Sequence, residues 1–72
     1  MKSNKVVREA MELDGISQAK LAERMGYSSQ GAVGNALARE NGMRVDVFIK
    51  MMKAMGWTIV AERGKERIEV DE

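Results

Sequence analysis

The chain has 72 residues, with 12 Lys or Arg and 11 Asp or Glu, so its formal net charge is only +1. This length fits one small domain with a modest core and a thin stability margin. Cysteine and histidine are absent, which excludes a disulfide framework, a thiolate zinc site and histidine-based acid–base chemistry. No apolar run is long enough to span a membrane and no signal peptide is evident, so we expect a cytoplasmic protein without a membrane partner.

The charges are distributed unevenly along the chain. Residues 1–60 carry nine basic and six acidic side chains, whereas residues 61–72 carry three and five. Because phosphate neutralisation needs only several well-placed cations, the small net charge does not exclude a nucleic-acid partner. Ordinary solvated faces explain the same charges equally well.

The first predicted helix spans residues 3–13 and ends at Asp14-Gly15. Its apolar residues follow helical spacing and predict one buried face: Val6, Ala10 and Leu13, with Val7 and Met11 beside them. The basic side chains of this helix fit a solvated surface better than contact with phosphate.

Two short helices joined by a tight turn follow, over residues 17–25 and 29–39. Ser17 is the expected N-cap of the first, and Gly26 ends it in the left-handed conformation. Ser28 or Ser29 is the expected cap of the second. The apolar residues predict that the two helices pack together as a helix-turn-helix: Leu21, Ala22 and Met25 against Val33, Ala36 and Leu37.

The outer face of the second of these helices is small and polar. Gly31 and Gly34 each cost a helix roughly 1 kcal/mol relative to alanine, so their presence needs a reason. Close approach to another surface is one such reason, because Gln30 and Asn35 carry amides of the type that bond bidentately to adenine in the major groove. A plain solvated face remains the alternative.

The fourth predicted helix spans residues 44–55. Its apolar stripe is expected to face the core: Val45, Phe48, Ile49, Met52 and Met55. Met51 lies off this stripe and fits either a partner surface or the interior.

After Gly56 the pattern alternates, which predicts a β-hairpin with strands at residues 57–63 and 67–71. An isolated hairpin is marginal in water, so it must pack on its own helices, pair with a partner, or both. We expect a homodimer through this hairpin, with the following interface residues: Trp57, Ile59, Val60, Ile68 and Val70. The alternative is a hairpin folded over its own helices, with Trp57 covering the core.

The chain resembles the helix-turn-helix family of lambda-type repressors and Cro, often called the XRE family. The resemblance covers about residues 6–56 and depends on Ser17-Gln18, Leu21-Ala22, Gly26, Val33 and Leu37. The spacing from Gly26 to Val33 is one residue longer than is usual in the family, and the extra residue is assigned to the turn. The expected fold is therefore mainly α: a four-helix lambda-repressor-like domain with a C-terminal hairpin.

This resemblance implies a sequence-specific regulator of transcription, acting as a repressor and homodimer on double-stranded DNA with a near-palindromic operator. It implies these contact residues: Gln18, Ser28, Ser29, Gln30, Gly31, Gly34, Asn35, Arg39, Asn41 and Arg44. Gln30 and Asn35 would read bases, and Gln18, Arg39, Asn41 and Arg44 would contact phosphate.

Neither an enzyme nor a cofactor or metal site is expected, because the sequence offers no nucleophile with a base, no pocketed carboxylate pair and no phosphate loop. The alternative function is an antitoxin or another module that neutralises a partner protein, with DNA binding secondary. The acidic tail and the methionine-rich stretch of residues 43–55 motivate it.

Overall fold

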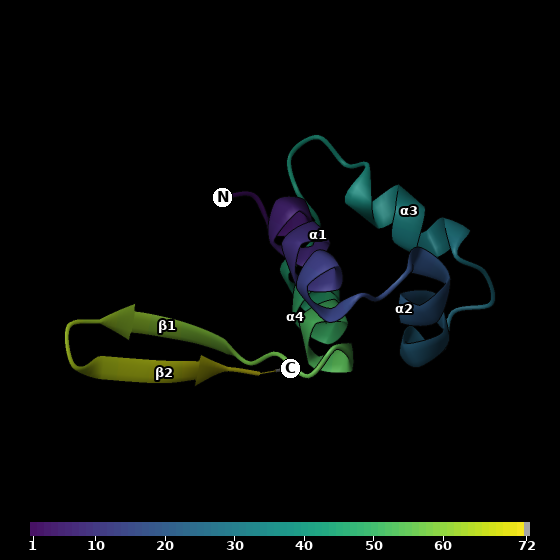
Figure 1. The fold of residues 1–72 in the computed structure, drawn as a ribbon. Helices are drawn as coiled ribbons and strands as arrows, with labels where there is room; N and C mark the ends of the chain where they lie inside the picture. The colour runs from purple at the N-terminus through teal and green to yellow at the C-terminus, as the bar shows by residue number, and fades with distance from the viewer. Residues whose placement is uncertain (72) are drawn as a thin grey trace.

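The computed structural model of the chain describes residues 1–71, which form four helices and one two-stranded antiparallel sheet (Figure 1). The elements in chain order are α1 Ser3–Asp14, α2 Gln18–Met25, α3 Gly31–Leu37, α4 Val45–Ala54, β1 Ile59–Arg63 and β2 Glu66–Val70. The prediction of a small, mainly helical chain with a C-terminal hairpin is confirmed. Within residues 1–71, no helix has the length and hydropathy needed to cross a bilayer.

The ends of α1 and α2 follow from local chemistry. Gly15 and Gly26, with φ of 64° and 77°, end the two helices in the left-handed conformation. Ser17 begins α2 with an extended backbone, and its hydroxyl accepts the Lys20 backbone N–H at 3.1 Å. The predicted Ser17 cap is therefore confirmed.

The core lies where the four helices meet. The largest fully buried side chains come one from each helix: Val7, Leu21, Val33 and Met51. α4 packs against α1 and α2, while α3 packs against α1 and α2. The two helices of the predicted helix-turn-helix are thus held by the same apolar cluster.

The buried face of α1 is rotated from the predicted one. Val7, Ala10 and Met11 are buried, whereas Leu13 is 75% exposed and Val6 only half-buried. Spacing alone fits either face, because Val7 and Met11 are also four residues apart. Packing against α3 and α4 buries the face that carries Val7 and Met11, and it leaves Leu13 at the surface.

The predicted stripe of α4 is wrong at Val45, which is 68% exposed. Met51, for which the sequence left both a partner surface and the interior open, is completely buried. α4 contacts both α1 and α2, so its buried side is wider than one stripe, and Val45 belongs to its first turn. The four methionines between residues 43 and 55 are all buried and fill the core.

The hairpin projects from the helical body (Figure 1). Its register pairs Ile59 with Val70 and Arg63 with Glu66. The loop between the strands has two residues, and its first, Gly64, has φ of 58°, as a type II′ turn requires. β1 begins at Ile59 rather than at Trp57.

The hairpin does not fold back over α1 and α4, so that alternative is wrong. Few contacts join the two strands to the helices. Trp57 is 39% exposed, and its indole N–H donates to the Asp14 carboxylate at 2.9 Å. The indole thus bonds at the end of α1 instead of sealing the core.

The burial of Met51 and the exposure of Val45 predict that truncating these two side chains of α4 has unequal effects on the free energy of unfolding. Met51→Ala should lower the free energy of unfolding by about 2–5 kcal/mol, or abolish cooperative unfolding, because it leaves a cavity. Val45→Ala should change it by less than about 0.5 kcal/mol. Urea unfolding followed by circular dichroism measures both, and equal losses would contradict this core.

Candidate nucleic-acid interface

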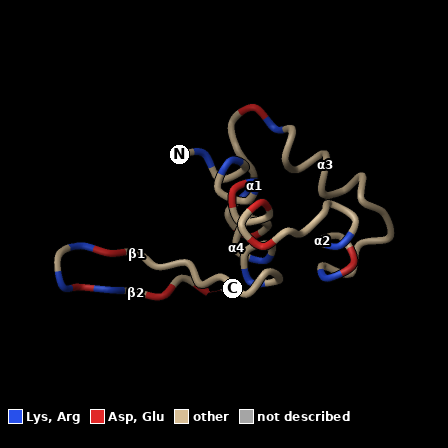
Figure 2. The backbone as a smooth tube through the Cα atoms, in the orientation of Figure 1, with Lys and Arg blue, Asp and Glu red and all other residues tan. Residues whose placement is uncertain are grey.

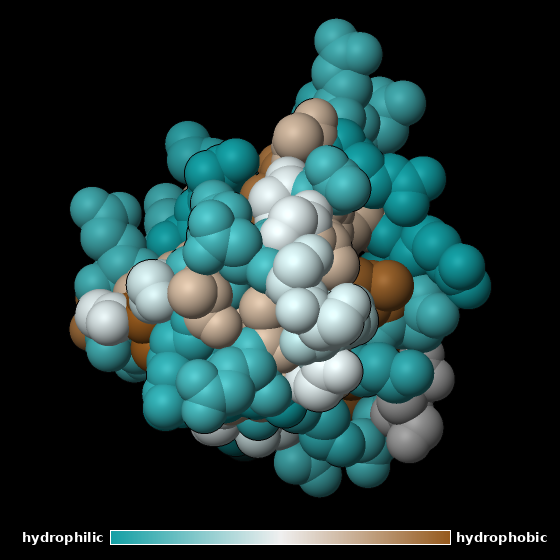
Figure 3. Space-filling view, turned by 90° about the vertical axis from the view of Figure 1, so that its right-hand side faces the viewer, coloured by the Kyte–Doolittle hydropathy of each residue, from teal (hydrophilic) through white to brown (hydrophobic). Residues whose placement is uncertain are grey.

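The candidate interface is the outer side of α2, α3 and the loops around them. α3 carries no charged side chain, whereas α2 and the loop after α3 carry several (Figure 2). Viewed from this side, a band of residues of intermediate hydropathy lies between strongly hydrophilic ones (Figure 3). The exposed surface of α3 is therefore small and uncharged within a charged surround.

The start of α3 differs from the prediction. The N-cap is Gln30, with φ of −68° and ψ of −16°, and its side chain makes no capping bond. Neither Ser28 nor Ser29 caps the helix, because the chain enters α3 through a turn with helical backbone rather than through an extended residue. α3 is also shorter than predicted, ending at Leu37.

Most of the predicted contact residues share this surface. The following are exposed: Ser28, Ser29, Gln30, Gly31, Asn35, Arg39, Asn41 and Arg44. Gln18 and Gly34 are half-buried. The exposed Ala32 and Ala38 also belong to the outer surface of α3 and its end, and Ala32 was missed because alanine gives no chemical signal.

The two glycines of α3 have different surroundings. A Cβ on Gly34 would lie 3.2 Å from the Gln18 side-chain oxygen, so this glycine admits the α2 side chain. A Cβ on Gly31 would meet only the Ser29 hydroxyl, at an ordinary 3.5 Å. Neither residue has positive φ. Packing within the chain therefore explains Gly34 and does not explain Gly31.

Three of the four predicted phosphate contacts, Arg39, Asn41 and Arg44, lie in and after the loop that follows α3, whereas Gln18 is the first residue of α2. The Arg44 guanidinium donates to the Asp46 carboxylate at 3.1 Å, and both side chains are at least one-third exposed. An exposed pair of this kind contributes little to stability, so Arg44 can exchange this partner for another anion. Arg39 and Asn41 are exposed beside the N-terminal turn of α1.

Four side chains of α1 and its preceding residue hold this loop, and sequence reasoning missed them. The Asn4 amide donates to the carbonyls of Leu37 and Arg39, at 3.2 and 2.9 Å. The Ser3 hydroxyl accepts the Met43 N–H at 2.9 Å. Lys2 and Arg8 also donate to loop-side carbonyls, namely those of Glu40 and Leu37. Contacts across more than 28 residues leave no local pattern in a sequence.

The predicted dimer residues lie in the hairpin and just before it. Ile68 is 69% exposed on β2, and Trp57 is exposed before β1. The other three are half-buried: Ile59, Val60 and Val70. Ile59 packs against the helical core.

Comparison of the chain with protein-family models, with curated proteins and with solved structures found no match.

The position of Gly34 predicts an energetic coupling to Gln18. In the wild-type chain Gly34→Ala must displace the Gln18 side chain, whereas in a Gln18→Ala background the same change brings only the gain in helix propensity. The double-mutant cycle should show a coupling of at least about 0.5 kcal/mol, measured by urea unfolding. Gly31→Ala with Gln18→Ala is the matched control and should be additive. Equal coupling in both cycles would contradict the geometry.

Proposed function

We propose that the chain is a sequence-specific, double-stranded DNA-binding regulator of transcription. It acts as a homodimer that represses by occupying a near-palindromic operator. Its α2–turn–α3 unit is a lambda-repressor-like helix-turn-helix, with α3 as the recognition helix in the major groove. The XRE-type resemblance of residues 6–56 motivates this proposal.

The observation that carries the proposal is Gly31. This exposed residue has neither the positive φ nor the close internal neighbour that would require glycine. Gly31 is the first residue of α3. At a position whose backbone conformation alanine can also adopt, glycine is less stable by about 0.4–1 kcal/mol, because it loses more conformational freedom on folding. A surface that approaches the α3 backbone from outside gives the missing reason, and the floor of a DNA groove is such a surface.

The polar groups next to Gly31 fit the same partner. Gln30 and Asn35 present exposed amides on a surface without charged side chains, and amides pair with adenine edges. Arg39 and Arg44 flank this surface in the following loop and at the start of α4, where cations suit phosphates. Base-reading and phosphate-contacting groups thus occupy separate zones.

The antitoxin alternative loses part of its motivation. The methionines of residues 43–55 are buried in the core, so they do not form an adaptable partner surface. The acidic tail still motivates it.

A binding selection tests the proposal directly. We expect a random duplex library, selected at near-physiological salt, to yield an inverted repeat with half-sites about 34 Å apart, one helical turn. Sequencing of the enriched duplexes gives the site. Sequence-blind retention that disappears with added salt would contradict sequence-specific binding.

Gly31→Ala separates a DNA role from a structural one. The variant should unfold at higher temperature, because alanine loses less backbone entropy on folding than glycine, which is worth about 0.4–1 kcal/mol. It should nevertheless bind the selected duplex at least tenfold more weakly, as measured by fluorescence anisotropy. Ala32→Gly is the control, since it lowers helix stability beside the same position and should retain more affinity than Gly31→Ala. Unchanged affinity of Gly31→Ala would remove the main support for this surface.

A further inference from the structure

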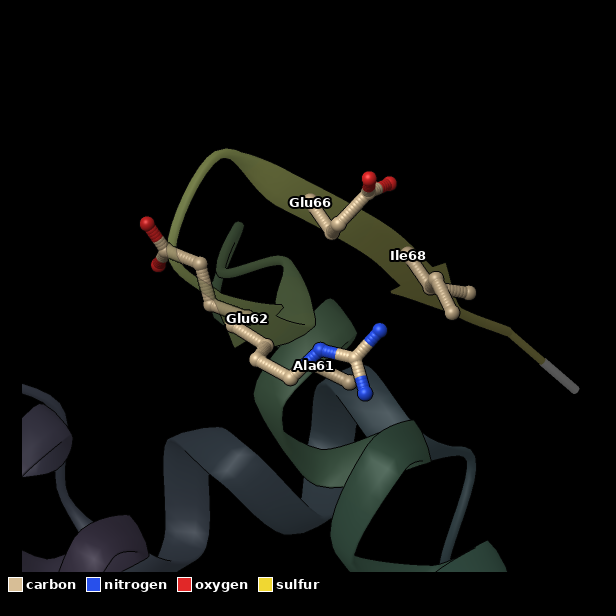
Figure 4. Close-up of a pocket in the computed structure, with 5 residues that line it drawn as sticks. Ala61, Glu62, Glu66 and Ile68 are labelled. Atoms are coloured by element: carbon tan, nitrogen blue, oxygen red, sulfur yellow. The ribbon is translucent and has the colours of Figure 1, made fainter.

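The hairpin leaves an open sheet edge and apolar side chains in water. Within residues 1–71 each strand pairs only with the other, so the outer edge of each presents unpaired backbone groups, which favour pairing with another chain. Ile68 is 69% exposed and lies opposite the exposed Ala61. These two residues line a shallow hollow on the hairpin together with Glu62, Arg63 and Glu66 (Figure 4). A two-stranded hairpin of this kind is marginal in water without further pairing.

The edge of β2 is the more open of the two. Thr58, Ile59 and Val60, at the start of β1, line a hollow together with Val6, Glu9 and Leu13 of α1. That end of β1 therefore lies beside the helical body. In β2, residues 66–69 are all exposed. A second strand therefore has access to β2 over these four residues, whereas the end of β2 lies near α4, where Lys53 bonds to Asp71.

The outer edge of β2 carries backbone N–H and C=O groups that are free to bond to another strand. Opposite residues of an antiparallel pair alternate between those that exchange both hydrogen bonds and those that exchange none. With a two-residue loop, the exchanging pairs are Arg63 with Glu66 and, two residues on, Ala61 with Ile68. The backbone groups of Arg67 and Glu69 consequently face away from β1.

We propose that β2 pairs antiparallel with β2 of a second copy of this chain, about a two-fold axis at Ile68. In this register Ile68 lies opposite the partner's Ile68, and Arg67 lies opposite the partner's Glu69. The symmetry repeats the second pair, so two opposite-charge pairs flank an isoleucine pair. Arg67 and Glu69 are also the residues whose backbone groups face outward, as exchanged hydrogen bonds require.

Other registers are less favourable. A slip by one residue places the apolar face of one strand beside the polar face of the other. A slip by two residues places Arg67 opposite the partner's Arg67, or Glu69 opposite the partner's Glu69, and directly opposed like charges destabilise a sheet. Of these alignments, the proposed one keeps the apolar faces together and places no like charges of β2 directly opposite each other.

The product is a four-stranded sheet with the two Ile68 side chains at the centre of one face. Each copy contributes four apolar residues to that face, Ile59, Ala61, Ile68 and Val70, with Arg63 and Glu66 beside them near the loop. The pairing of β2 with the partner's β2 is called the seam below. This inference names the dimer interface and rests only on the homodimer part of the proposed function, because the seam forms without DNA. A failure to dimerise and a failure to bind DNA can therefore be told apart.

A charge exchange tests the seam. Arg67→Glu and Glu69→Arg each place like charges opposite each other in a homodimer, but an equimolar mixture restores two opposite-charge pairs in a heterodimer. Sedimentation equilibrium without DNA should show a dimeric wild type, at least tenfold weaker association of each variant alone, and recovered association in the mixture. Lys50→Glu is the charge control on the exposed surface of α4 and should remain dimeric. A monomeric wild type, or a mixture no more associated than its components, would overturn the seam.

Two single proline variants test the seam in a second way, in case a charge variant fails to form the hairpin. Arg67 and Glu62 lie opposite each other, and the N–H groups of both face outward. Proline is tolerated at such edge positions but cannot donate a hydrogen bond. Arg67→Pro should abolish dimerisation, whereas Glu62→Pro, which alters the β1 edge, should retain it. The reverse result would assign the seam to β1 and refute the proposal.

Discussion

The structure depends on hydrogen bonds between the first turn of α1 and the exit of α3. α1 and α2 end at glycines with positive φ, but Ala38 after α3 has φ of −83° and ψ of −8°, so α3 lacks this ending. A helix that stops without a left-handed residue leaves carbonyls in need of donors. The Asn4 amide supplies them to Leu37 and Arg39. A side chain from the first turn of the chain thus completes a helix more than 30 residues away.

The same bonds fix the candidate interface to the body of the domain. α3 has only seven residues, too few for a stable helix in isolation, so its position comes from packing and from these bonds. Its buried side is held by Val33 and Leu37 in the shared core. Its exit is held from α1, where Ser3 also accepts the Met43 N–H. α3 is therefore attached to the body of the domain both along its buried side and at its exit.

Local signals in the sequence predicted most of the fold. Ser17, Gly15 and Gly26 mark helix ends through their own chemistry, and the alternation after Gly56 marks the hairpin. The failures came from tertiary choices: neighbouring helices selected which face of α1 and α4 is buried, against Leu13 and Val45. In the candidate site, exposure of the α3 amides followed from periodicity. The start of α3 did not, because the chain enters the helix with helical backbone at Gln30 and without a serine cap.

Gly31 and β2 are two of the places where the chain departs from what the stability of a single molecule favours. Gly31 is exposed and no packing contact requires a glycine there, which lowers the stability of the isolated domain. The unpaired edge of β2 and its exposed Ile68 leave hydrogen-bonding groups and an apolar side chain in water. A domain of 72 residues has little stability to spare. Local violations of this kind concentrate where a protein meets something else. Because α3 and the hairpin lie at opposite ends of the molecule (Figure 1), the proposed DNA contact and the proposed dimer contact use separate surfaces.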